Sequence, residues 1–91
     1  MHEIHAFIKG KVQGVAYRNY VQSAADTLGI VGWVKNLSDG SVEVLAQGTT
    51  DSLKEFIEYL HEGSLTSKVE EVSVDWSTAK KVYDDFSIMY E

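Results

Sequence analysis

The spacing of the apolar residues changes twice in the first half of this chain of 91 residues. This change restricts the possible folds more than any other feature. Apolar residues recur at every second position in 2–11, at every third or fourth position in 18–28, and are then dense in 30–36. A period of two is typical of strands with one buried face, and a period near 3.6 is typical of amphipathic helices. The turn signal Ser38-Asp39-Gly40 predicts a hairpin from 30–36 into an alternating segment that contains Val42, Val44 and Ala46.

The second half repeats the pattern. Residues 51–62 carry a second helical stripe, which we expect to begin at an N-cap formed by Thr50 or Asp51. Alternating residues follow in 72–76, and a last alternating segment in 86–90 contains Phe86, Ile88 and Tyr90. The order predicted is therefore strand, helix, strand, strand, helix, strand, with one further strand at the end.

Two β-α-β units with room for a strand between them predict an α+β fold, the ferredoxin-like split β-α-β sandwich. We expect a mostly antiparallel sheet with two helices on one face, strand order 4-1-3-2, and the C-terminal strand on an edge. Residues 1–91 are expected to form a single domain, because the chain is short and has no proline-rich or repetitive linker. Trp33 and Trp76 are expected in the core.

The negative charge is concentrated in the second half of the chain. The net charge is −6, whereas residues 1–50 hold four acids and four bases. A protein that binds nucleic acid usually presents an extended basic face, so this charge balance argues against a nucleic-acid partner. It also argues against an RNA-binding sheet, which needs aromatic residues on central strands within a basic surface.

The chain has no cysteine, which excludes disulfides and thiolate chemistry. No apolar run approaches the ~18 residues of a membrane span, and no export signal is evident. We therefore expect a cytoplasmic protein that does not bind membranes, with a monomer as the default state. His2 and His5 lack a third ligand at a suitable spacing, so no metal site is expected.

The single arginine of the chain, Arg18, ends a glycine-containing segment that leads into the first predicted helix. A guanidinium group matches the oxygens of phosphate, and a glycine loop before a helix presents backbone N–H groups to the same kind of anion. The segment is Gly10-Lys11-Val12-Gln13-Gly14-Val15-Ala16-Tyr17-Arg18. It predicts an oxyanion site with one fixed cation.

This segment, GKVQGVAYR, resembles the first signature of the acylphosphatases, and residues 32–48, GWVKNLSDGSVEVLAQG, resemble the second. The likeness extends through the helix at 51–62 and spans nearly the whole chain. Two positions depart from the pattern. Ala16 stands where family members often have glycine or a large aromatic residue, and Leu65 stands where a proline follows Gly-Ser in many relatives.

The resemblance implies that the protein hydrolyses small acyl phosphates to a carboxylate and inorganic phosphate, the latter also acting as an inhibitor. It implies that Arg18 binds the phosphate, that Asn36 positions the attacking water, and that no metal or organic cofactor is used. It also implies that the phosphate is surrounded by the backbone N–H groups of the loop. The phosphate-binding residues are then Gln13, Gly14, Val15, Ala16, Tyr17 and Arg18.

Alternatives remain from the sequence alone. Asn36 precedes a Ser-Asp-Gly turn, where asparagine is common for conformational reasons. Tyr17 is more often a packing residue than a ligand. A non-catalytic module of the same fold, binding an anion or another protein, would also contain this loop.

Overall fold

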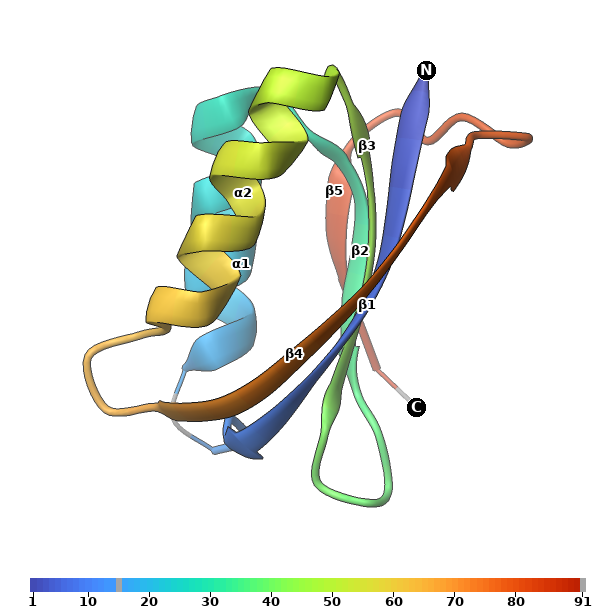
Figure 1. Cartoon of the computed structure of the whole chain (residues 1–91). Helices are drawn as coiled ribbons and strands as arrows, with labels where there is room; N and C mark the ends of the chain where they lie inside the picture. Colours follow the sequence, from blue (N-terminus) through green and yellow to red (C-terminus); the bar gives the residue numbers. More distant parts are fainter. Residues whose placement is uncertain (15, 91) are drawn as a thin grey trace.

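Seven elements follow one another in a computed structural model of the chain, which describes residues 1–14 and 16–90. Their order confirms the prediction (Figure 1). The elements are β1 (His2–Lys11), α1 (Tyr17–Leu28), β2 (Val31–Asn36), β3 (Val42–Gly48), α2 (Thr50–Glu62), β4 (Lys68–Thr78) and β5 (Phe86–Met89).

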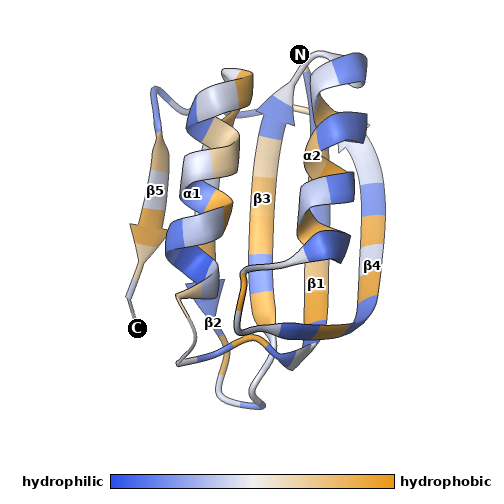
Figure 2. Cartoon of the chain, turned by 90° about the vertical axis from the view of Figure 1, so that its left-hand side faces the viewer, coloured by the Kyte–Doolittle hydropathy of each residue, from blue (hydrophilic) through white to orange (hydrophobic). Residues whose placement is uncertain are grey.

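The strands form one sheet in the order β4-β1-β3-β2-β5. The first four strands are antiparallel to their neighbours, and β5 is parallel to β2, which makes the sheet mixed. The predicted order and the place of the last strand on an edge are therefore confirmed. Both helices cover the same face, α1 over β2 and β5, and α2 over β1 and β4 (Figure 2).

The core lies between the helices and the central strands. Ile4 pairs with Ala46 and Ile8 with Val42, and all four side chains are fully buried, as the period of two predicts. Each large apolar side chain buried in this way contributes about 1.5 to 3 kcal/mol to folding. The core thereby holds β1 and β3 side by side beneath the helices.

The outer strands and the helix start differ from the sequence-based predictions. β4 begins at Lys68, four residues before the predicted segment, because an edge strand tolerates charged residues that break the alternation. The N-cap of α2 is Thr49, whose Oγ1 accepts from the N–H of Ser52 at 3.1 Å, and not Thr50 or Asp51. In the described part of the chain, no helix is long and apolar enough to cross a membrane.

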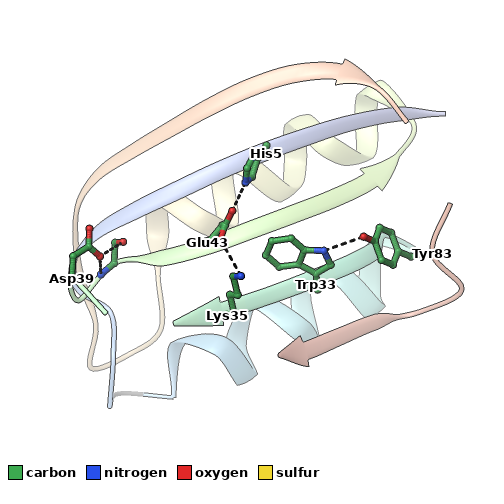
Figure 3. Close-up of polar contacts among 7 residues, drawn as sticks. His5, Trp33, Lys35, Asp39, Glu43 and Tyr83 are labelled. Carbon is green, nitrogen blue, oxygen red and sulfur yellow. Dashed lines mark hydrogen bonds and ion pairs between the residues drawn. The ribbon is translucent and has the colours of Figure 1, made fainter. Parts of the chain in front are cut away.

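Neither tryptophan is in the core. Trp76 is opposite Ile4 in register but stands on an outer strand with one neighbouring strand, and 45% of it is exposed. Trp33 is half-buried on the face without helices, where its Nε1 donates to the hydroxyl of Tyr83 at 3.3 Å (Figure 3). On the same face, His5 and Glu43 form a hydrogen bond of 2.5 Å.

Tyr17 joins the two helices through its buried hydroxyl, which donates to the carbonyl of Leu60 at 2.8 Å. Burial, and secondarily the nearby Tyr20, raises the pKa of Tyr17 far above its usual value. The fold therefore favours the neutral phenol. Its contribution to stability is complete below the unfolded-state pKa of about 10 and decreases as the pH rises beyond it.

Replacing Tyr17 with phenylalanine is expected to lower the free energy of unfolding by about 1 to 3 kcal/mol at pH 7, because a buried carbonyl loses its donor. The wild type should lose stability above pH 10 more steeply than the variant, since only the wild type must ionise this phenol on unfolding. Urea unfolding at pH 7 and pH 10.5 measures both effects. Tyr20→Phe, which removes a similar bond from a half-buried site, should have a smaller effect on the pH dependence. If the unfolding free energies of wild type and Tyr17→Phe declined equally above pH 10, the raised pKa of Tyr17 would be contradicted.

Candidate active site at the start of helix α1

The chain turns from β1 into α1 through backbone conformations with positive φ. Gly14 has φ 72°, and Ala16, the N-cap of the helix, has φ 59° and ψ 22°. Glycine adopts this left-handed region freely, whereas an L-residue such as alanine is strained there. Val15 was predicted to contribute to the phosphate site and lies outside the described residues.

Ala16→Gly is expected to raise the free energy of unfolding by about 0.5 to 1 kcal/mol, because relief of the left-handed strain exceeds the added entropy of the unfolded chain. The same substitution at Ala24, within regular helix, should instead lower it by about 1 kcal/mol or more. Chemical denaturation of both variants measures the contrast. Loss of stability in Ala16→Gly comparable to that in Ala24→Gly would contradict the strain at the helix start.

A pocket of about 350 Å³ opens at this turn. It lies between the start of α1 and the ends of β2 and β5, so it joins segments that are distant in the sequence. Its lining residues are Val12, Gly14, Ala16, Tyr17, Arg18, Asn19, Asn36, Ile88 and Tyr90.

The start of α1 is suited to an anion. No side chain of residues 1–14 or 16–90 caps this helix end, and its first turn contains no acidic residue. The first N–H groups of a helix have no partner within the helix, and the helix dipole places partial positive charge at this end. Tyr17, Arg18 and Asn19 form the first turn, so their N–H groups are available to a phosphate-sized guest.

Arg18 is half-buried beside the C-terminal strand. Its guanidinium carbon lies 4.9 Å from the centre of the Tyr90 ring, and its Nη1 donates to the carbonyl of Met89 over 3.4 Å. Among residues 1–14 and 16–90, no carboxylate lies within ion-pair distance of it. Stacking on an aromatic face orients a guanidinium while leaving its N–H edge free for an oxyanion.

Asn36 is the last residue of β2, opposite Val42 of β3. Its Oδ1 is buried and has no hydrogen-bond partner among the described residues. A buried acceptor of this kind is uncommon in folded proteins and often has a functional explanation. Asn36 also lines the pocket that Arg18 lines.

The predicted residues take different positions around the pocket. Arg18, Asn36, Gly14, Ala16 and Tyr17 line it together. The ring of Tyr17 is buried in the core, so its backbone N–H is the group that can serve an anion.

Gln13 is not among the lining residues, and its side chain points to the hairpin between β2 and β3, where it donates two hydrogen bonds. The role predicted for Gln13 is that of its backbone N–H, and it stays a prediction.

Four lining residues were not predicted from the sequence: Val12, Asn19, Ile88 and Tyr90. The alternation in 86–90 predicted a strand that contains both Ile88 and Tyr90, whereas β5 ends at Met89, so only Ile88 lies within it. Both residues reach the pocket only because β5 pairs in parallel with β2, with Met89 opposite Lys35. Tyr90 directly follows Met89, and Asn36 directly follows Lys35, so the two residues come next along the two paired strands. No local sequence signal predicts that Tyr90 and Asn36 are neighbours.

Comparison with known proteins gives a consistent result. The profile of the acylphosphatase family matches residues 4–88. An acylphosphatase of Salinibacter ruber is 47% identical over 85 residues, covering 93% of this chain and 90% of the relative. The crystal structure of acylphosphatase from Bacillus subtilis superposes with a TM-score of 0.96 at 42% identity, covering 99% of this chain and all of the other. A structure of an acylphosphatase from Coxiella burnetii gives 0.90 at 40% identity, covering 96% and 90%. With this match over nearly its whole length, the chain belongs to the acylphosphatase family.

Proposed function

We propose that this protein hydrolyses the carboxyl-phosphate bond of small acyl phosphates, with Arg18 anchoring the phosphate and Asn36 orienting the attacking water. The observation that carries the proposal is one pocket with three features among the described residues: an arginine without a paired carboxylate, a helix start without a side-chain cap, and an asparagine whose buried oxygen has no partner.

In the proposed step, the water oxygen forms a new bond to phosphorus while the bond from phosphorus to the acyl oxygen breaks. The electron pair of that bond leaves on the carboxylate. A carboxylate is a good leaving group, so the reaction requires little acid catalysis from the protein. The main requirement is to position the reactants and stabilise charge on the phosphoryl oxygens.

Arg18 meets this requirement with a forked pair of donors, and the loop adds backbone N–H groups. We propose Gln13, Gly14, Val15, Ala16, Tyr17 and Arg18 as the residues whose backbone surrounds the phosphate. Donors whose directions are fixed before substrate arrives need little reorganisation during the reaction.

Asn36 offers the water a neutral acceptor that does not repel the phosphate. None of the nine described lining residues is a carboxylate or a histidine that could take the water's proton. We therefore propose that a phosphate oxygen of the substrate accepts it. On these residues the mechanism needs no metal or organic cofactor.

Hydrolysis of benzoyl phosphate by the purified protein, followed by loss of its ultraviolet absorbance, tests the proposal. We expect turnover in the presence of EDTA, competitive inhibition by inorganic phosphate, and much slower hydrolysis of p-nitrophenyl phosphate, whose leaving group is poorer. Phosphate binding without turnover of any acyl phosphate would instead favour a non-catalytic anion-binding module.

We also propose that residues 1–91 act as a single-domain, cytoplasmic monomer. The outer strand β4 carries exposed charges at Lys68, Glu70, Glu71 and Asp75, which oppose pairing with a second sheet. A chain without cysteine is compatible with a reducing compartment. Light scattering coupled to size-exclusion chromatography measures the oligomeric state.

A further inference from the structure

The side chain of Gln13 connects two loops at the pocket end of the sheet. Its Nε2 donates to the carbonyl of Leu37 and to the carbonyl of Ser41, each at 2.8 Å. These two carbonyls belong to the two ends of the turn between β2 and β3. A primary amide is one of the few neutral groups that can donate two hydrogen bonds from one atom.

The turn that receives these bonds is itself ordered. The N–H of Leu37 donates to the carbonyl of Ser41 at 2.9 Å, and the N–H of Gly40 donates to the carbonyl of Leu37 at 3.2 Å. Asp39 accepts from both the N–H and the hydroxyl of Ser41, at 2.9 and 2.5 Å (Figure 3). Gln13 therefore binds a turn with a defined shape, and displacement of one end would move the other.

The two connected loops each carry half of the site. Gln13 directly precedes Gly14 and the rest of the loop proposed to bind phosphate, and Leu37 directly follows Asn36. The distance between the phosphate and the water thus depends on how these two segments are held together. In a reaction that relies on positioning, a displacement of about 1 Å can slow the step by about a hundredfold.

We infer that Gln13 is a positioning residue: its side chain sets the place of Asn36 relative to the phosphate-binding loop. The inference rests on the proposed hydrolysis, and it gives the side chain of Gln13 a role separate from that of its backbone N–H. Gln13 acts through Asn36, so its loss should affect turnover more than phosphate binding.

A glutamine with a purely structural role should affect stability and not turnover, and Gln47 provides the matched control of this kind. Gln47 is also a glutamine that joins distant segments, donating to the carbonyl of Lys81 at 2.5 Å and to Glu3 at 2.9 Å, and accepting from the N–H of Tyr83 at 3.1 Å. It is fully buried and pairs with Val31, at the end of β2 opposite to Asn36. Gln47→Leu should therefore destabilise the protein without changing the site.

The kinetic test uses Gln13→Met, which keeps the length of the side chain and removes both donors. We expect kcat for benzoyl phosphate to fall by about tenfold or more. The inhibition constant of inorganic phosphate should change by less than about threefold, because the substitution leaves the contacts to phosphate in place. Gln47→Leu should leave kcat within about twofold while lowering the melting temperature more, since Gln47 is fully buried and the substitution removes its three hydrogen bonds.

A double-mutant cycle shows whether the effect passes through Asn36. In an Asn36→Ala background, Gln13→Met should slow hydrolysis by less than about twofold, because the group that it positions is already absent. An equal loss in both backgrounds, or a parallel loss of phosphate inhibition, would overturn the inference.

Hydrogen exchange gives a readout independent of activity. In Gln13→Met, the N–H groups of Leu37 and Gly40 should exchange about tenfold faster or more, while Gln47→Leu should accelerate Tyr83 and leave those two unchanged. Unchanged exchange at Leu37 and Gly40 in Gln13→Met would overturn the inference even in an active enzyme. If the wild type hydrolysed no acyl phosphate, the proposed function would fail on that result alone, and the exchange rates would still decide whether Gln13 couples the two loops.

Discussion

Arg18→Ala should cost about 3 to 5 kcal/mol of transition-state stabilisation for benzoyl phosphate hydrolysis, as removal of other charge-stabilising groups in phosphoryl transfer does. The reason is that Arg18 is the only arginine of the chain and the only cationic side chain among the described lining residues of the pocket. Both kcat/KM and inhibition by inorganic phosphate should decline, because the guanidinium contacts the phosphate in the ground state and in the transition state.

Two variants separate the role of the guanidinium from that of charge in general. Arg18→Lys keeps the charge and loses the planar fork, so its activity should lie between those of wild type and alanine. Lys54→Ala makes the same change in net charge on the exposed side of α2 and should leave kcat/KM unchanged. The folded state should be little affected, since the contacts of Arg18 with the described residues are one long hydrogen bond and one ring contact. If Arg18→Ala hydrolysed benzoyl phosphate as fast as wild type, the proposed mechanism would be wrong.

Asn36→Ala should lower kcat by about 10² to 10³, the range found when one oriented hydrogen-bonding group is removed from an active site. Inhibition by phosphate should persist, because Asn36 is proposed to hold the water and not the anion. The free energy of unfolding should be no lower than that of wild type, since the substitution removes a buried oxygen that has no partner among the described residues. Steady-state kinetics with and without phosphate, together with urea unfolding, measure all three.

Asn19→Ala is the matched control, because Asn19 lines the same pocket from the exposed first turn of α1. It should reduce kcat by no more than a few-fold. Asn36→Asp keeps the shape of the side chain and adds a negative charge, so it should weaken phosphate inhibition as well as turnover. A loss of phosphate inhibition in Asn36→Ala that matched its loss of turnover would make Asn36 a binding residue.

The elements of the fold could be predicted where burial on one face imposes a period on the sequence. Ile4, Ala6 and Ile8 alternate because the helices cover one side of β1. The predictions failed where that constraint is weak. β4 is an edge strand, so its charged start at Lys68 shows no period, and Trp76, although apolar and correctly spaced, is nearly half exposed.

The residues of the site also divide into those that the sequence predicts and those that only the structure reveals. Arg18 and Asn36 were identified through two sequence signatures, and the structure brings them into one pocket, while their catalytic roles stay predictions. Tyr90 and the side-chain bonds of Gln13 had no comparable signal, because each depends on a contact between segments far apart in the chain.

By itself, the sequence determined the order of the strands and helices, the family, and the position of the single arginine at a helix start. These are local properties, set by the spacing of apolar residues and by the conformations that glycine allows. Only the tertiary structure decided that the ends of β2 and β5 meet the start of α1, that Tyr90 stacks on Arg18, and that Gln13 joins the two loops. The physical reason is that such contacts depend on strand pairing and on the helices packing over one face of the sheet, which no short segment encodes.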